Sequence, residues 1–147
     1  MLKAMKTMNL SQRNNFPPLL HLTYNLQQLS DETLLREAGV GLSQARIMSA
    51  LYQDVPRSQR SIATVLSQTE ANISRQLRTM KKQGLVRIVK NKKDARQRDV
   101  TLTSKGNRKY RAAEKILKKQ QSNFLRLLSS SEVKAFEAAA RNLGAQL

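Results

Sequence analysis

The chain has 147 residues, 39% of them hydrophobic, and its 27 lysine and arginine residues outnumber ten acidic residues, for a formal net charge of +17. It has no cysteine, which excludes disulfides, thiol nucleophiles and thiol-based redox sensing. Neither a secretory leader nor a run of about 20 apolar residues stands out, so we expect a cytoplasmic protein without a membrane partner.

The positive charge is concentrated in one part of the chain. Residues 57–119 hold 19 basic and four acidic side chains, whereas the other 84 residues are close to neutral. Such an asymmetry indicates a polyanionic partner that faces one region of the fold. Duplex DNA, RNA, an anionic membrane surface and a merely solvated basic face all stay open at this point.

The chain is predicted to begin with an arm and a helix. Residues 1–15 are polar and without periodicity, which indicates a flexible arm. A helix is expected from Pro17-Pro18 to about Ala38, because proline is tolerated in a first turn and residues 39–41 contain two glycines. A leucine stripe with 3-4-3 spacing runs along it, at Leu19, Leu22, Leu26 and Leu29.

Three shorter helices are expected next. The first is capped by Ser43 and ends before Pro56, the second covers about residues 58–67, and the third covers residues 69–83. Gly84 follows the third helix, at the position where a positive φ is needed. The predicted core positions of the three helices are Ile47, Ala50 and Leu51, then Ile62, Ala63 and Leu66, then Ile73, Leu77 and Met80.

The pattern then changes from helix to strand. Residues 85–89 and 100–103 are rich in β-branched side chains and predict two strands. The polar, charge-packed segment from Lys90 to Asp99 joins them, which predicts a hairpin with a long basic tip. The expected fold class is therefore mainly α with a small β-hairpin wing.

Two more helices complete the prediction. One is expected over about residues 104–128, and the last begins among the serines 129–131. Their apolar positions are Tyr110, Ala113, Leu117, Phe124 and Leu127, then Val133, Phe136, Ala140 and Leu143. These stripes exceed what one small lobe covers, which allows a homodimer whose dimerisation helices are residues 16–38 and 104–147. A monomer whose terminal helices fold back on their own core is the alternative.

Residues 43–103 then form a lobe suited to duplex DNA. A helix with its side chains is roughly 10–12 Å across, close to the major-groove width of about 12 Å. Ser58 and Gln59, at the start of a helix, are expected to contact phosphates, which helix amino-termini favour. The side chains that the helix 69–83 is expected to offer to the major groove are Thr69, Asn72, Ser74, Arg75, Gln76 and Arg78.

The hairpin tip, residues 90–99, is expected to enter the neighbouring minor groove, where a focused negative potential favours arginine. The residues assigned to this contact are Lys90, Lys92, Lys93, Asp94, Arg96 and Arg98. Lys115, Lys118 and Lys119 in the following helix either contact DNA or only add to solubility.

Other functions have less support in the sequence. Modules for single-stranded RNA usually stack bases on aromatic side chains, and the basic segment holds only Tyr110. His21 is the only histidine, no glycine-rich phosphate loop is present, and the few carboxylates are dispersed, so neither an enzyme nor a metal site is expected. A basic RNA-binding protein is the second hypothesis, and membrane-surface binding by residues 104–128 is a weaker one.

At this point the sequence resembles the MarR family of winged helix-turn-helix regulators, over about residues 42–128. Residues 42–51 are similar to the second helix of the family. The helix-turn-helix and first wing strand of the family are similar to three segments of this chain: residues 58–66, residues 73–77 with Met80, and residues 82–86.

The wing carries the sharpest resemblance. Asp94-Ala95-Arg96 is followed by Leu102-Thr103 and then Gly106, in the register of the family. The resemblance implies that Asp94 holds Arg96 in place for the minor groove; a plain surface turn is the alternative for Asp94. The turn before residue 69 departs from the family, because Ser67-Gln68 stands where a small and then an apolar residue are usual.

The resemblance also implies a mode of action. A two-fold dimer would present two recognition helices to a pseudo-palindromic operator, more often as a repressor than as an activator. No cofactor is implied. A small-molecule effector of unknown identity is a candidate ligand, in a pocket near His21, Tyr24, Met48 and Tyr52, for which ordinary core or interface packing is the alternative.

Overall fold

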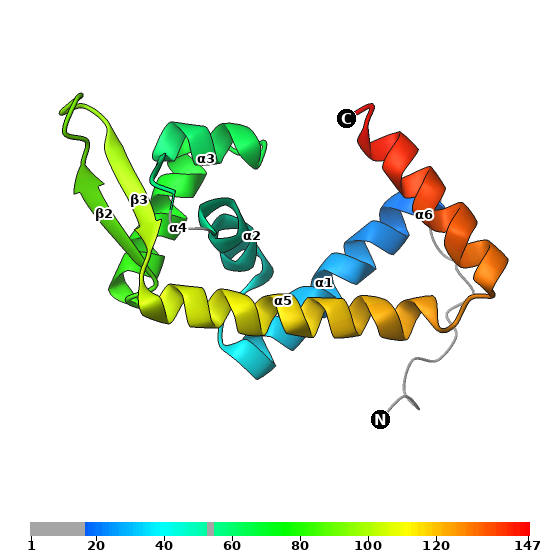
Figure 1. Cartoon of the computed structure of the whole chain (residues 1–147). Coiled ribbons are helices and arrows are strands. Elements are labelled where there is room, and N and C mark those ends of the chain that lie inside the picture. Colours follow the sequence, from blue (N-terminus) through cyan, green and yellow to red (C-terminus); the bar gives the residue numbers. More distant parts are fainter. Residues whose placement is uncertain (1–16, 53–54) are drawn as a thin grey trace.

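The computed structural model describes residues 17–52 and 55–147, so the expected arm and Asp54 lie outside the described residues. The chain forms a mainly helical fold with one small sheet (Figure 1). Within the described part, no helix is both long enough and apolar enough to cross a membrane. The elements are α1 (Pro18–Ala38), α2 (Leu42–Leu51), β1 (Arg57–Ser58), α3 (Gln59–Val65), α4 (Glu70–Lys82), β2 (Val86–Lys90), β3 (Arg98–Leu102), α5 (Ser104–Leu125) and α6 (Ser130–Gly144).

The sheet is antiparallel, with strand order β1-β3-β2. β2 and β3 form the expected hairpin, from the pair Val86–Leu102 to the pair Lys90–Arg98. The predicted loop of residues 90–99 is therefore too long, because the ladder continues to Lys90 and Arg98. β1 was not predicted, since two residues carry no alternation pattern; it exists because Arg57 pairs with Val100.

The core lies in the lobe formed by the C-terminal end of α1, α2 to α4, the sheet and the first half of α5. Residues Ile62 and Ala63 of α3 are buried as predicted, and so is the α4 face of Ile73, Leu77 and Met80. On α2, Ala45 and Met48 join the buried face, whereas Ala50 is only half-buried, and so is Leu66 after α3.

Two glycines end helices as expected. Gly39 follows α1 with a φ of 67°, and Gly84 follows α4 with a φ of 72°, both in the left-handed region that glycine adopts at little cost.

The predicted cap at Ser43 is wrong, because α2 begins two residues earlier than that cap implies, at Leu42. Gly41 is the cap residue, and its N–H donates to Gln44 Oε1 at 3.3 Å. The Leu42 N–H donates to the Asp31 carboxylate at 2.7 Å. Asp31 belongs to α1, so a tertiary contact replaces the local cap that the sequence suggested.

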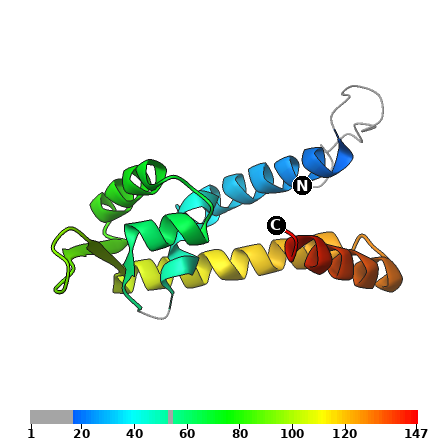
Figure 2. The ribbon, with the colours of Figure 1, turned by 90° about the horizontal axis from the view of Figure 1, so that it is seen from above.

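α5 is the longest helix and runs from the wing to the opposite end of the molecule, where α6 turns back from it (Figures 1 and 2). α5 ends at Leu125, three residues earlier than predicted, and Leu127 is 77% exposed. Ser129 is the serine that caps α6. Within the described part of the chain, no residue of α6 is fully buried: Val133 is half-buried, and Phe136 and Leu143 are 48% and 56% exposed.

Candidate nucleic-acid interface

The candidate recognition helix is α4, the second helix of the helix-turn-helix. Ser67 in the turn has a φ of 51°, which bends the chain between α3 and α4. Thr69 caps α4, because its Oγ1 accepts the Asn72 N–H at 3.2 Å. With one face of α4 in the core, Arg75 and Arg78 lie exposed on the opposite side. Sequence reasoning placed these two arginines correctly away from the core.

Other predicted side chains of α4 are less free. Asn72, Ser74 and Gln76 are half-buried. Asn72 Nδ2 donates to Gln68 Oε1 at 2.8 Å, and Gln76 Nε2 donates to the same oxygen at 3.2 Å. Arg75 in turn donates to Asn72 Oδ1 at 2.9 Å. Gln68, which the sequence marked only as an unusual turn residue, is thus the centre of a polar network on α4.

The start of α3 is tied to the start of α4. Ser58 caps α3 by accepting the Ser61 N–H at 3.1 Å, and Gln59 Nε2 donates to the Glu70 carbonyl at 3.3 Å. Arg60 Nε lies 4.0 Å from Glu70 Oε1. Of the two predicted phosphate-contact residues, Gln59 therefore joins α3 to α4, whereas Ser58 caps α3 and keeps its hydroxyl proton available for donation.

The tip of the wing is organised by Asn91, which sequence reasoning missed. Asn91 Nδ2 donates to the Asp99 carboxylate at 2.9 Å, while Asn91 Oδ1 accepts the N–H groups of Lys93 and Asp94. Asp94 Oδ1 accepts the backbone N–H of Arg96 at 2.9 Å. Asp94 thus contacts Arg96, as the resemblance implied, but the bond is to the backbone N–H of Arg96 and not to the Arg96 guanidinium.

The wing and the start of α3 share a cavity of about 480 Å³. Five of the predicted contact residues line it, and they come from two segments about 40 residues apart in the sequence: Ser58, Gln59, Asp94, Arg96 and Arg98. Lys92 and Lys93 lie exposed at the tip, and Lys90 is exposed at the end of β2. The fold therefore brings the predicted phosphate and wing residues together on one side of the lobe.

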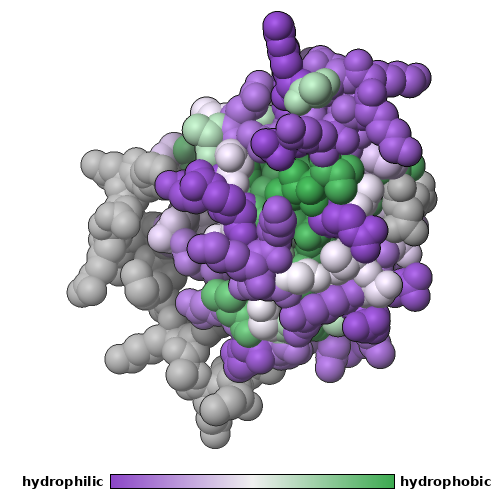
Figure 3. Space-filling view, turned by 90° about the vertical axis from the view of Figure 1, so that its left-hand side faces the viewer, coloured by the Kyte–Doolittle hydropathy of each residue, from purple (hydrophilic) through white to green (hydrophobic). Residues whose placement is uncertain are grey.

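This side of the molecule is strongly hydrophilic. Figure 3 looks at it from the side of the wing and shows a polar surface around a smaller hydrophobic area. The arginines of α4 and of the wing tip, Arg75, Arg78, Arg96 and Arg98, are all exposed to solvent. Its composition suits a polyanion whose charges are spread over a long surface.

Lys105 and Lys109 of α5 both donate to backbone carbonyl groups at the ends of other helices. Lys105 Nζ donates to the Gln83 carbonyl at 2.7 Å, at the end of α4. Lys109 Nζ donates to the Ala38 carbonyl at 2.6 Å, at the end of α1. Both cations satisfy carbonyl groups at helix C-termini, where positive charge is favourable. Part of the basic excess therefore stabilises the fold, which the net charge alone did not reveal.

The four residues of the candidate effector pocket have different environments. Met48 is fully buried in the core, whereas Tyr24 is 58% exposed. His21 is half-buried, and Tyr52 stacks against Tyr110 with ring centroids 4.7 Å apart.

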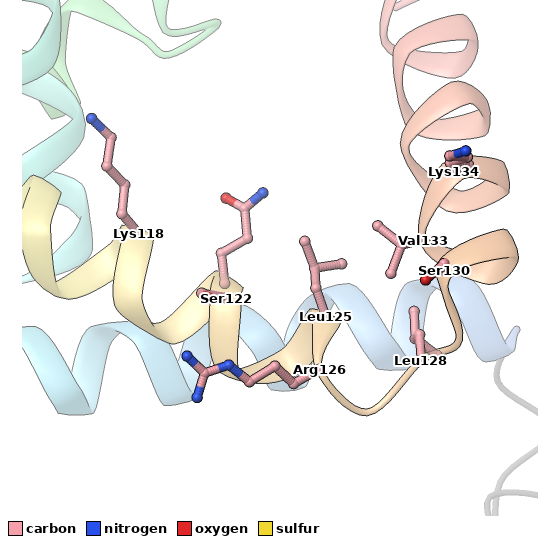
Figure 4. Close-up of a pocket in the computed structure, with 9 residues that line it drawn as sticks. Lys118, Ser122, Leu125, Arg126, Leu128, Ser130, Val133 and Lys134 are labelled. Atoms are coloured by element: carbon pink, nitrogen blue, oxygen red, sulfur yellow. The ribbon is translucent and has the colours of Figure 1, made fainter.

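Two cavities lie near the junction of α5 and α6, and other residues line them. One of about 630 Å³ opens between the two helices, where Leu125 and Val133 point toward each other (Figure 4). The other, of about 570 Å³, is lined largely by apolar side chains of α1, α5 and α6.

The comparisons with known proteins agree with this architecture. Residues 38–97 match the model of the MarR family. No curated relative matches the sequence. The resemblance found in the sequence is thus confirmed over the helix-turn-helix and most of the wing.

Solved structures share the fold over most of the chain. A Staphylococcus aureus MepR–DNA complex is 21% identical with a TM-score of 0.75, covering 87% of this chain and 94% of that one. A MarR crystal structure is 18% identical with a TM-score of 0.79, covering 92% and 95%. Wild-type apo MarR from E. coli is 20% identical with a TM-score of 0.71, covering 88% and 98%.

Proposed function

We propose that this chain, whose residues 38–97 are a MarR-family segment, is a homodimeric transcription regulator that binds double-stranded DNA and has no enzymatic activity. The observation that carries the proposal is the exposure of Arg75 and Arg78 on α4 and of Arg96 and Arg98 on the wing, together with the cavity that brings Arg96 and Arg98 beside Ser58, Gln59 and the first residue of α4, Glu70. The neighbour with a similar fold that was solved as a MepR–DNA complex supports the same partner.

In this proposal residues 43–103 are the DNA-binding lobe and act in two grooves. α4 enters the major groove, where Arg75 and Arg78 reach base edges. The wing enters the minor groove with Arg96, while Ser58 and Gln59 contact the phosphate backbone between the two. The operator is pseudo-palindromic, and the protein represses by covering a promoter.

The homodimer rests on apolar surface that a single chain does not cover. α6 has no buried residue within the described part of the chain, and Leu20, Leu22 and Phe136 are 51%, 42% and 48% exposed. The apolar cavity of α1, α5 and α6 adjoins them. A second copy related by a two-fold axis would cover the same patch on both chains and place two copies of α4 on one face. Residues 18–38 and 104–147 are then the dimerisation helices.

Selection of bound fragments from a randomised duplex library, using the purified full chain, tests DNA binding and yields the operator. We expect enrichment of an inverted repeat, and an affinity that falls steeply with salt, by a log–log slope of about −0.9 per phosphate contact. Arg96→Ala is expected to weaken binding strongly, whereas Arg75→Ala also relaxes the base preference in each half-site, by about 1–3 kcal/mol.

Structured RNA of equal length is the competitor in the same assay. Competition by RNA as effective as that by duplex DNA would favour the RNA-binding hypothesis instead. Operator binding by both arginine variants at the wild-type level would show that the assigned roles are wrong. The effector stays a secondary proposal, tested by ligand-induced release of the operator in wild-type protein and in Tyr24→Ala.

A further inference from the structure

We infer that Gln68, in the turn before α4, is a positioning residue that sets the base preference of Arg75 by acting through Asn72. The inference rests on the proposed DNA binding and deepens it, because it names the residue that fixes how the reading arginine is presented. The sequence pattern assigns no such role to Gln68.

The backbone places Gln68 firmly. Ser67 has a φ of 51°, and the Gln68 N–H donates to the Ala63 carbonyl at 2.9 Å, so the turn is held from α3. Residues 72 and 76 share one face of α4 because they are four apart, and the side chain of Gln68, which precedes the cap residue Thr69, reaches that face. Its Oε1 accepts from Asn72 Nδ2 at 2.8 Å and from Gln76 Nε2 at 3.2 Å.

These bonds fix which way Asn72 points its carboxamide. With Nδ2 committed to Gln68, Oδ1 is directed toward Arg75, whose guanidinium donates to it at 2.9 Å. An exposed arginine otherwise loses considerable rotamer freedom when it binds two atoms of one guanine. The hydrogen bonds from Gln68 through Asn72 restrict the Arg75 side chain before DNA binds. This preorganisation favours the base that Arg75 can contact in that orientation.

Asn72 and Gln76 are therefore better suited to holding other side chains in place than to contacting base edges directly. Both are half-buried, and Gln76 Oε1 is buried without a hydrogen-bond partner in the described part of the chain. A carboxamide enclosed in this way is poorly placed to reach a base edge. An apolar residue at position 68 would leave Asn72 Nδ2 and Gln76 Nε2 without their acceptor, so the polar turn and the polar face of α4 belong together.

The test compares base preferences selected from a randomised duplex library by wild type, Gln68→Leu, Arg75→Ala and the double variant. We expect Gln68→Leu to lose roughly fivefold or more of the discrimination at the one half-site position that Arg75→Ala also relaxes. In the Arg75→Ala background, Gln68→Leu is expected to change that position no further, because its effect passes through Arg75. The two donors that lose their acceptor are half-buried, so Gln68→Leu should lower the unfolding midpoint, and base preferences are compared at a temperature where every variant is folded.

Gln68→Glu is the conservative control. It keeps an acceptor oxygen for Asn72, so the preference at that position should persist, although its negative charge weakens binding to every sequence alike. Asn72→Ala cuts the same link at a second residue and gives the same comparison if Gln68→Leu does not fold. Loss of preference in both Gln68 variants would contradict the inference.

Two failures are distinguishable. If wild type selects no duplex sequence, the proposed function fails and the inference falls with it. If wild type is selective and Gln68→Leu and Asn72→Ala retain its preference at the Arg75 position, only the positioning role is overturned.

Discussion

Gly106 lies where α5 passes closest to the turn that precedes β2. A Cβ at this position would overlap the Leu85 carbonyl oxygen and come within 3.2 Å of Leu102 Cδ2. Nearby, Thr103 Oγ1 donates to the Gly84 carbonyl at 2.6 Å and accepts the Gly106 N–H at 3.0 Å. The spacing of Thr103 and Gly106 after the wing thus has a packing reason as well as a family resemblance.

Gly106→Ala is accordingly expected to lower the free energy of unfolding by about 1–3 kcal/mol, because backbone must move to admit the methyl group. Gly144→Ala is the matched control, since nothing lies within 4 Å of a Cβ there and alanine is the better helix former. Urea unfolding of both variants measures the difference. Equal stability of the two would contradict the close approach of α5 to Leu85.

Asp94 gives a second prediction at the residue scale. Asp94→Asn and Asp94→Ala both remove one negative charge, but only asparagine keeps a side-chain oxygen for the Arg96 N–H. If the backbone bond is what orders the tip, Asp94→Asn should bind operator at least as tightly as wild type, and Asp94→Ala more weakly than Asp94→Asn. Fluorescence anisotropy at fixed salt measures both. Equal loss in the two variants would point to an ion pair with the guanidinium instead.

Among the elements, α6 depends on its first turn, because a single chain offers it little packing. Glu132 accepts the Ser129 N–H and the Ser129 hydroxyl, at 2.8 and 2.7 Å. These two bonds lower the pKa of Glu132 below its ordinary value of 4.5, and the bond from the Ser129 hydroxyl has the larger effect. The charged form therefore supports α6 fully above pH 4.5, and this support is lost as the pH falls from there through the lower pKa of the folded chain.

We expect amide hydrogen exchange at Ser129 to accelerate as the pH falls through that window, beyond the intrinsic change in exchange rate. NMR titration of the Glu132 carboxyl carbon gives the folded pKa directly. Glu132→Gln keeps an acceptor without a titrating group, so the extra pH dependence should vanish in it. Persistence of the effect in Glu132→Gln would assign it to another group.

The bond from Lys109 to α1 makes a prediction about α5. Lys109→Met removes the donor that satisfies the Ala38 carbonyl and is expected to cost about 1–3 kcal/mol of unfolding free energy. Lys115→Met removes the same charge from an exposed position of the same helix and should change stability by no more than about 0.5 kcal/mol. Thermal and urea unfolding compare the pair. Similar stability of both variants would mean that the cap contributes nothing.

For the whole molecule, the proposed homodimer predicts that charge placed on the uncovered apolar patch of α1 and α6 disrupts the dimer. In analytical ultracentrifugation, the double variant Leu22→Glu with Phe136→Glu should be a monomer of 16.7 kDa, because the buried charges would oppose association. Wild type should have about twice that mass. Val65→Glu is the control, because Val65 is exposed on α3, outside the patch. A monomeric wild type, or a dimeric double variant, would contradict the proposed interface.

The sequence predicted those parts of the molecule that depend on local pattern. The buried face of α4 repeats with the helical period, Gly84 needs a positive φ, and β-branched runs form the hairpin, so each could be found within a short window. What the sequence missed joins distant segments. The Asp31 cap of α2 spans 11 residues, and the bond from Lys109 to Ala38 spans 71. Such contacts exist only once tertiary packing brings the partners together.

The candidate site divides in the same way. The exposure of Arg75 and Arg78 could be predicted from their face of α4, and that of Arg96 and Arg98 from their place in a polar hairpin tip. The supporting roles of Gln68 and Asn91 lay hidden, since a carboxamide has no charge or periodicity to mark it. Whether it faces DNA or another side chain is decided by hydrogen bonds across a turn.

α5 is an uninterrupted helix of 22 residues, roughly 33 Å long at about 1.5 Å per residue. One end is fastened to α4 through Lys105, and the other reaches the apolar patch. A tilt of α5 by about 10° about its end at the apolar patch would displace its Lys105 end by roughly 6 Å, more than the rise of one helical turn. In the proposed homodimer, the distance between the two copies of α4, and hence their fit to successive major grooves, would therefore be set at the far end of α5.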